Sequence, residues 1–470
     1  MNKYTFFLRR DKDMAIDRQR VREQDKIARR SNFDAVESNL TPEQVKLEAS
    51  RCLHCKNPRC VQGCPVNIQI PDFIEAIKNN NLDKAGDIIR QTSMLPSVCG
   101  RVCPQERQCE GNCVLGIKGE SVAIGALERY VGDNTRASQT EIKPSGKKVA
   151  IVGSGCAGIT AAADLRKAGH EVVVFEALHK LGGVLRYGIP PFRLPRTFLD
   201  REIENLKNMG VEFKTNVIVG KSITLKQLKE DGFDAIFICS GAGLPKMMHI
   251  KGENLNGVYS ANEFLTRVNL MGAGRQDSPT PLRVGKKAAI IGGGNVAMDA
   301  ARTAVRVGFE EVSIMYRRTE KELPARLEEI RHAKEEGIVF KFLHSPVEIL
   351  EKDGYVAGMK FEKMELGEPD ESGRRRPVGT GEFVNENVDT VIVALGTDPN
   401  PIIQRSAQYD GLNIETDRKG YITVDSETRS TNIACVYAGG DVAPVRESNA
   451  INAMGAGKKA AKAINEMLAK

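Results

Sequence analysis

Residues 147–176 read "KKVAIVGSGCAGITAAADLRKAGHEVVVFE", and this stretch decides the fold class. The apolar run "VAIV" is followed by a glycine-rich turn, an alanine-rich helical segment and a second apolar run that ends at Glu176. Glycines spaced as Gly153, Gly155 and Gly158 let the backbone approach a pyrophosphate at the positive end of a helix. An acid about twenty residues further on accepts hydrogen bonds from ribose hydroxyls. A structural turn alone would leave this acid unexplained, so we predict a dinucleotide site at these four residues.

A second unit with the same outline lies at residues 285–318, "GKKAAIIGGGNVAMDAARTAVRVGFEEVSIMYRR". Its turn places Gly292, Gly294 and Ala297 after an apolar run. The following run ends without an acid and continues into Arg317 and Arg318. An acid at this point would repel a 2′-phosphate, whereas a guanidinium pairs with it. We therefore predict that this unit binds NADP(H) rather than NAD(H), with two solvated arginines as the alternative.

Later glycine motifs fit a flavin. "YAGGDV" places Gly440 and Asp441 after a third apolar run, and an alanine- and glycine-rich helix is expected from about Ala450. "CSGAG" (239–243) and "ALGTDPN" (394–400, with Gly396) look like strand-end turns where two domains join. Strands alternating with helices favour parallel sheets. The second unit is thus expected to be inserted in the first, with Gly183 and Gly396 among the residues that bind the cofactors.

Eight of the 11 cysteines lie in two blocks, "CLHCKNPRCVQGCPVN" (52–67) and "CGRVCPQERQCEGNC" (99–113). Zinc ligation, disulfides and electron transfer are all possible uses of such blocks. The C-x₂-C-x₄-C-x₃-C-P pattern of the first block resembles bacterial ferredoxin runs, in which the fourth cysteine serves another cluster. A zinc ribbon would instead have two C-x₂-C pairs separated by one loop. The pattern favours iron, and spacing alone leaves all eight cysteines as candidate ligands.

Taken together with "IGALERY" (124–130), "LGGVLRYGIPPFRLP" (181–195) and "YRRTEKELPA" (316–325), these motifs resemble one family from about Leu40 onward. It is the family of the NADPH-dependent glutamate synthase small (beta) subunit. The family includes the large subunit of the NADH-dependent reduced ferredoxin:NADP oxidoreductase, a bifurcating transhydrogenase. The resemblance implies an α/β two-dinucleotide-binding (Rossmann-like) flavoprotein with an N-terminal helical iron–sulfur domain.

The same resemblance implies FAD, NADP(H) and two [4Fe–4S] clusters. One cluster would be held by Cys52, Cys55, Cys60 and Cys113. The other would be held by Cys64, Cys103, Cys109 and the non-cysteine ligand Glu128, which leaves Cys99 without iron. The expected domains are residues 1–145 for the clusters, 146–265 and 389–470 for FAD, and 266–388 for NADP(H).

We expect an NADPH-dependent oxidoreductase that passes electrons to or from a second subunit. The wording of the first cysteine block favours a small flavoprotein with its own iron–sulfur cluster as that subunit, and ferredoxin as a further partner. A glutamate synthase large subunit is the alternative. A disulfide oxidoreductase is disfavoured because residues 285–389 contain no cysteine. A zinc-bound interaction module with vestigial nucleotide folds remains a third possibility.

Composition adds little to these expectations. The net charge of +7 is modest and spread along the chain, and no aromatic-rich basic stripe indicates nucleic-acid binding. No apolar stretch approaches the ~20 residues that span a bilayer, and the first residues lack the apolar core of a signal peptide. We therefore expect a cytoplasmic protein that binds neither membrane nor nucleic acid.

Overall fold

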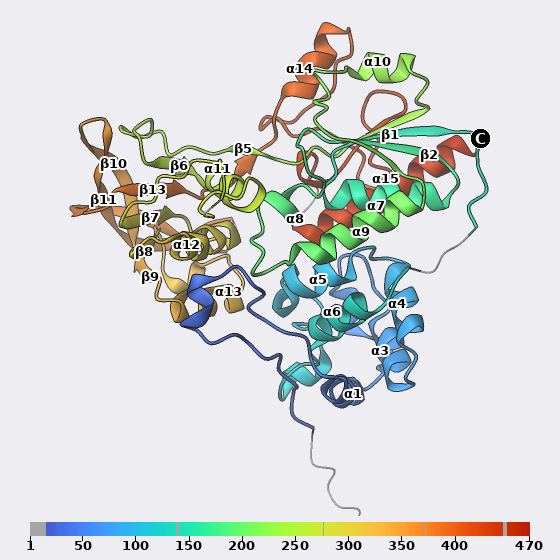
Figure 1. Ribbon diagram of the computed structural model, residues 1–470, viewed down its shortest axis with the longest axis horizontal. Coiled ribbons are helices and arrows are strands. Elements are labelled where there is room, and N and C mark those ends of the chain that lie inside the picture. The colour runs from blue at the N-terminus through green and yellow to red at the C-terminus, as the bar shows by residue number, and fades with distance from the viewer. Residues whose placement is uncertain (1–15, 138–140, 276, 372, 445–448) are drawn as a thin grey trace, which may run out of the picture.

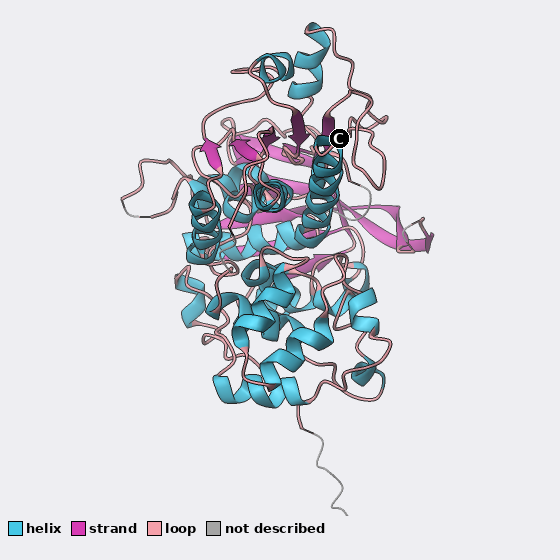
Figure 2. Ribbon diagram, turned by 90° about the vertical axis from the view of Figure 1, so that its right-hand side faces the viewer, coloured by secondary structure: helices cyan, strands magenta, loops and turns pink. Residues whose placement is uncertain are grey.

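The computed structural model describes residues 16–137, 141–275, 277–371, 373–444 and 449–470. Figure 1 shows a helical N-terminal part below two sheet-containing parts, one at the upper right and one at the left. The side view in Figure 2 separates the helical part from the strands above it. The predicted fold class is confirmed: an α/β protein with two parallel, Rossmann-like sheets and a helical domain before them.

The N-terminal part consists of short helices joined by loops that carry the cysteines. Thr41 caps the helix that begins at Pro42: its side chain accepts a hydrogen bond from the backbone N–H of Gln44, and the Gln44 side chain accepts one from the backbone N–H of Thr41. The last helix of this part, α6, ends at Asn134. The helices are η1 (Ala28–Ser31), α1 (Pro42–Ser50), α2 (Arg59–Gln62), α3 (Ile70–Lys78), α4 (Leu82–Arg90), α5 (Pro96–Val102), η2 (Gln105–Arg107), η3 (Val114–Ile117) and α6 (Ile124–Asn134).

The first sheet has the order β15-β4-β1-β2-β3, and its neighbouring strands pair in parallel. Its edge strand β15 comes from the far end of the chain, so the sheet is discontinuous in sequence. The strands are β1 (Lys148–Val152), β2 (Glu171–Phe175), β3 (Glu212–Lys214), β4 (Ala235–Ile238) and β15 (Val436–Ala438). The accompanying helices are α7 (Cys156–Lys167), α8 (Val184–Tyr187), α9 (Arg196–Asn208), α10 (Leu225–Glu230), α14 (Ile402–Tyr409), η6 (Gly440–Val442) and α15 (Ala450–Leu468).

The second sheet has the order β6-β13-β7-β8-β9 and is also parallel. Two of its strands, β6 (Val258–Ser260) and β13 (Thr390–Val393), lie outside the 266–388 segment expected for this domain. A two-stranded ribbon of β5 (Leu244–Pro245) and β14 (Thr397–Asp398) joins the two sheet-containing parts. The other elements are β7 (Lys287–Ile291), β8 (Glu311–Tyr316), β9 (Val339–Phe342), α11 (Ala261–Leu265), the π-helix η4 (Thr266–Leu270), α12 (Asn295–Val307), η5 (Glu320–Glu322) and α13 (Leu327–Glu335).

A third, antiparallel sheet has the order β10-β11-β12, and the sequence analysis did not predict it. It is built by β10 (His344–Lys352), β11 (Tyr355–Pro369) and β12 (Arg375–Glu386), and it extends at the far left of Figure 1. Buried Met359 and Phe361 pack it against the second sheet. In the part of the chain that the structure describes, no helix is both long and apolar enough to cross a membrane.

Candidate cofactor and cluster sites

The first glycine turn lies between β1 and α7, with Gly155 as the N-cap residue of the helix. Gly153 has φ +114°, and a Cβ there would stand 2.5 Å from the carbonyl oxygen of Cys239. A Cβ on Gly158 would collide with the carbonyl oxygen of Gly153. Apart from the neighbours of Gly155 along the chain, none of the described residues has an atom within 4 Å of a Cβ built there. Two of the glycines thus serve close packing, whereas the third leaves an open cradle of the kind that a pyrophosphate occupies.

Glu176 ends β2 as predicted, but its carboxylate faces the glycine turn. One oxygen accepts from the backbone N–H of Ser154 at 3.0 Å and from the Ser154 hydroxyl at 2.5 Å. The other oxygen accepts from the N–H of Leu178 at 2.9 Å. The turn at Gly183, with φ +53°, passes so close that a Cβ would lie 2.9 Å from the Cα of Gly155. The structure therefore brings Gly155, Glu176 and Gly183 together around one cradle.

The C-terminal motif "YAGGDV" lies next to the same glycine turn. Gly440 has φ +70° and its Cβ position lies 3.2 Å from the Cβ of Ala157, in the first turn of α7. Helix α15 begins at Ala450, as expected, and is capped by the Asn449 side chain. Asp441 and Ala450 thus lie near the glycine turn. Gly396 lies elsewhere: it follows β13, at the ribbon between the two sheet-containing parts, and its carbonyl accepts from the backbone N–H of Lys246 at 3.0 Å.

The second glycine turn repeats the geometry of the first. Gly292 has φ +142°, and a Cβ there would collide with the carbonyl oxygen of Ala394. Gly294 is the N-cap residue of α12, and, as at Gly155, its Cβ position has no atom of a non-neighbouring described residue within 4 Å. Ala297 is fully buried in the helix behind it. Both turns therefore have an open middle position at a helix N-terminus.

The two arginines after β8 are in different environments. Arg317 is exposed, and no ion pair involving it is found among the described residues. Arg318 is buried: its Nη2 is 2.5 Å from a carboxylate oxygen of Asp370, and its Nε donates to the carbonyl of Arg375 at 2.7 Å. Of the predicted pair, only Arg317 has its guanidinium free for an anion in this arrangement.

An outer cavity collects the first predicted ligand set. Cys52, Cys55, Cys60 and Cys113 line it together, although they come from both cysteine blocks. All four cysteines are half-buried. Burial raises the pKa of the Cys60 thiol to about 11.

An inner cavity collects the second set: Cys64, Cys103, Cys109 and Glu128 line it, as does Cys99. The three cysteines are buried, and Glu128 is 5% exposed with its Oε1 lacking any hydrogen-bond partner among the described residues. Burial, and next the charge of Cys99, raise the pKa of Glu128 well above the usual carboxyl range. An orphaned carboxylate among three thiols fits a site for a cationic group, whose charge would offset the cost of burial.

The donor spacing separates an iron–sulfur cluster from zinc. Four thiolates at about 2.3 Å from one tetrahedral zinc ion lie about 3.8 Å apart. Among the described residues, no three cysteine sulfurs lie within 4.8 Å of one another. Both cavities are therefore too wide for a closed zinc site and fit a larger group.

The contact between the inner cavity and the C-terminal helix α15 was not predicted from the sequence. Ile451, in the first turn of α15, lines the inner cavity, and a Cβ on Gly455 would lie 3.3 Å from Val66. The thiol of Cys99 lies 3.5 Å from the sulfur of Met454 on the same helix. The helix that begins next to Gly440 and Asp441 therefore also forms one wall of the inner cavity.

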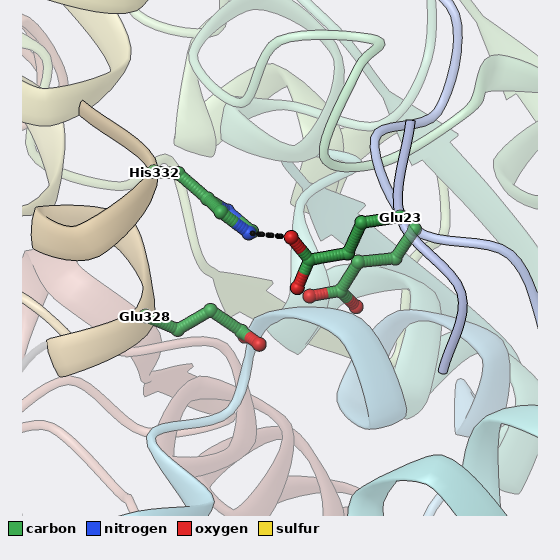
Figure 3. A group of neighbouring side chains, drawn as sticks. Glu23, Glu328 and His332 are labelled. Carbon is green, nitrogen blue, oxygen red and sulfur yellow. Dashed lines mark ion pairs between the residues drawn. The ribbon is translucent and has the colours of Figure 1, made fainter. Parts of the chain in front are cut away.

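One other group of potential ligands links the N-terminal segment to α13 (Figure 3). His332 is 3.3 Å from a carboxylate oxygen of Glu23, and Glu37 and Glu328 complete the group. Each of its three acids already has an arginine partner: Arg331 and Arg29 for Glu23, Arg129 for Glu37, and Arg326 for Glu328. We interpret the group as an ionic link between two parts of the chain rather than as a metal site.

Comparison with known proteins places these sites in a family. Residues 29–140 match the family model "Dihydropyrimidine dehydrogenase domain II, 4Fe-4S cluster", and residues 112–227 and 147–457 match "Pyridine nucleotide-disulphide oxidoreductase". The chain is 37% identical over 455 residues to the glutamate synthase [NADPH] small chain of Escherichia coli K12, covering 94% of this chain and 95% of that protein. It is 38% identical to the NADP(+)-dependent formate dehydrogenase subunit beta of Moorella thermoacetica, covering 87% of this chain and 60% of that protein.

Among solved structures, FprA of Mycobacterium tuberculosis in complex with NADPH superimposes with a TM-score of 0.57 at 22% identity, covering 70% of this chain and 85% of that chain. This likeness concerns the fold alone.

Proposed function

The chain belongs to the family of glutamate synthase small chains, and on this premise we propose that it is the electron-transferring subunit of a larger complex. It is an NADPH-dependent oxidoreductase with FAD- and NADP-binding sheets and an iron–sulfur domain. When bound, FAD exchanges a hydride with the nicotinamide, and iron–sulfur clusters carry single electrons. The chemistry belongs to these groups, so no residue of the chain is proposed as general acid, base or nucleophile.

The two cradles would hold the two nucleotides. At each, the open middle glycine and the N-terminal N–H groups of α7 or α12 would bind the phosphates of the nucleotide. We propose that FAD takes the cradle of Gly155, with Asp441 and α15 beside it, and that NADP(H) takes the cradle of Gly294. Arg317 would bind the 2′-phosphate. Arg318 would support it indirectly by holding the turn before β12 in place.

The single observation that carries the proposal is the separation of nine candidate donors into two cavities. The outer cavity is lined by the four cysteines that the family resemblance assigns to one cluster, and the inner cavity by the four donors assigned to the other cluster together with Cys99. We therefore propose two [4Fe–4S] clusters, an outer one on Cys52, Cys55, Cys60 and Cys113, and an inner one on Cys64, Cys103, Cys109 and Glu128. Because α15 borders both the inner cavity and the FAD cradle, the inner cluster would exchange electrons with the flavin and the outer cluster with the partner.

Two partners were expected from the sequence, and one relative favours one of them. A glutamate synthase small chain matches 94% of this protein over 95% of its own length, which supports a glutamine-hydrolysing large subunit as the partner. The bifurcating arrangement with a small flavoprotein rests on the wording of the first cysteine block alone. We keep the bifurcating arrangement as the second candidate because related chains also belong to other enzymes, such as an NADP(+)-dependent formate dehydrogenase.

The test is reconstitution with each partner. The purified chain should contain one FAD and about eight iron atoms, the content of two [4Fe–4S] clusters. Mixed with a glutamate synthase large chain, it should oxidise NADPH only when glutamine and 2-oxoglutarate are both present. NADPH formation that needs both NADH and reduced ferredoxin, in the presence of the small flavoprotein, would instead assign the bifurcating role. A chain without iron or flavin would refute both candidates.

A further inference from the structure

The two nucleotide cradles lie in different parts of the chain. We call the part built on β1–β4 and β15 the first-sheet part, and the part built on β6–β9 and β13 the second-sheet part. The ribbon that joins them has only two residues in each strand. Hydride exchange needs reacting atoms about 3–3.5 Å apart, and a misplacement of about 1 Å can cost about a hundredfold in rate. So small a ribbon is marginally stable by itself, and other contacts must set the orientation of the two parts.

One such contact is made by the loop between α8 and α9 of the first-sheet part. Arg193 of this loop lies 2.7 Å from Asp299 on α12 and 2.7 Å from Glu329 on α13. All three side chains are buried. The neighbouring Phe192 is 1% exposed, and the guanidinium carbon of Arg306 on α12 lies 3.9 Å from the centroid of its ring. The loop is therefore held by two helices of the second-sheet part.

The N-terminal segment, residues 23–37, packs on the same loop. In Figure 1 this segment is drawn in blue and runs beside α13. Phe33 lies against Phe192 with the ring centroids 6.2 Å apart. The backbone N–H of Val36 donates to the carbonyl of Phe192 at 2.9 Å. The segment, which the sequence motifs did not explain, thus covers the contact between the two sheet-containing parts.

Arg29 of this segment enters the second-sheet part, where it is 1% exposed. Its Nε lies 3.0 Å from Glu336, and its Nη2 lies 2.7 Å from Glu335 at the end of α13. Glu336 does not need this partner for its charge, because Arg302 at 2.9 Å and Arg306 at 2.6 Å pair with it from α12. Pairing roughly repays the cost of burying a guanidinium, so the contact adds little net stability, whereas the planar fork accepts only a narrow range of geometries.

We propose that Arg29 is a positioning residue for hydride exchange: it holds the second-sheet part in the orientation in which bound NADP(H) meets bound FAD. The proposal rests on the proposed function, because it needs both nucleotides in their cradles. Arg29 acts through α13 and α12, and α12 begins at the cradle of Gly294. In the step concerned, the C4–H bond of NADPH breaks, the hydrogen and both bond electrons form the N5–H bond of the flavin, and NADP⁺ and anionic reduced flavin result. Arg29 takes no part in these bond changes.

The test compares Arg29→Met with a matched control, Arg90→Met, in the whole chain with its cofactors. Arg90 is 5% exposed, and its guanidinium donates to the hydroxyl of Thr135 and to the carbonyl of Arg136, both within the helical domain. Each variant replaces a buried guanidinium with a thioether, so thermal melting should show a similar loss of stability. Only Arg29 connects two parts of the chain. Arg29→Lys serves as the conservative variant, because it keeps the charge without the fork.

Three measurements separate positioning from stability. Anaerobic stopped-flow reduction of the flavin by NADPH gives the limiting rate and the Kd of NADPH. Arg29→Met should lower the limiting rate about tenfold and weaken the charge-transfer absorption between NADPH and flavin, while the Kd changes by less than about twofold, because the cradle of Gly294 and Arg317 are intact. Arg29→Lys should recover part of the rate. Small-angle X-ray scattering should show a larger maximum dimension for Arg29→Met than for Arg90→Met, whose flavin reduction should match that of the unaltered protein.

Contrary results are distinguishable from a failure of the proposed function. The positioning role is overturned if Arg29→Met keeps the limiting rate and the charge-transfer absorption, or if only the Kd of NADPH changes. It is also overturned if Arg90→Met loses as much rate, because the effect would then follow stability. If Arg29→Met does not fold, Phe33→Leu, which loosens the same segment at Phe192, is measured by the same criteria. An unaltered protein whose flavin is not reduced by NADPH overturns the proposed function itself.

Discussion

The outer and inner cavities draw their cysteines from the same two sequence blocks but present opposite environments. The outer one has four half-buried cysteines and an exposed rim, whereas the inner one has four buried cysteines, a buried carboxylate and a wall formed by α15. The difference follows from position: the outer cavity lies next to α2 and η3 at the surface, and the inner one lies where the helical domain packs on the FAD-binding part. Similar ligand chemistry can thus serve exchange with a partner at one site and exchange within the chain at the other.

The largest test of this comparison removes one ligand from each cavity. Cys60→Ala should lower the iron content from about eight to about four atoms per chain, and Cys109→Ala should do the same through the other cluster. Electron paramagnetic resonance should show that NADPH still reduces the inner cluster in Cys60→Ala but not in Cys109→Ala. Complete iron loss in both variants would show that the cavities hold one interdependent site.

A second test concerns the ligand choice within the inner cavity. Glu128→Ala removes the proposed oxygen ligand and should change the resonance spectrum or occupancy of one cluster. Cys99→Ala should leave both clusters in place, because its thiol packs on Met454 and Ser93. Iron analysis and spectra of the two variants decide the matter. Retained iron and unchanged spectra in Glu128→Ala, together with iron loss in Cys99→Ala, would reverse the assignment.

A third test uses metal removal from the unaltered protein. Because the outer cysteines are half-buried and the inner ones buried, a chelator with an oxidant should strip the outer cluster several-fold faster. Released iron should appear in two phases of equal amplitude, and the resonance signal of the outer cluster should be lost in the fast phase. A single phase would mean that exposure does not distinguish the two sites.

The smallest expected effect is on packing. Ile451 is 2% exposed against the inner cavity, so Ile451→Ala should destabilise the protein by about 2–4 kcal/mol. Leu53 at the outer rim is exposed, and Leu53→Ala should change stability by less than about 0.5 kcal/mol. Thermal melting of both variants with cofactors bound measures the difference. Equal melting temperatures would contradict the contrast between a packed and an open cavity.

Much of the architecture could be predicted because it is encoded locally. A glycine turn needs only a few neighbouring residues to form, so strand, turn and helix follow directly from residues 147–176 and 285–318. The start of α1 was predictable for the same reason, since Thr41 and Gln44 cap it by themselves. The antiparallel sheet of β10–β12 was missed, because its long strands carry many charged residues and pair only through contacts that the sequence does not display.

The sequence by itself determined the fold class, the two glycine-turn units and the clustering of the cysteines. Only the tertiary structure decided that Arg318 is engaged by Asp370 while Arg317 stays free, because Asp370 reaches it from a strand pair about fifty residues away. Only the tertiary structure, too, placed Ile451 and Met454 beside cysteines more than three hundred residues earlier. The physical reason is that burial and pairing depend on which distant surfaces meet, whereas turns and helix caps depend on neighbours along the chain.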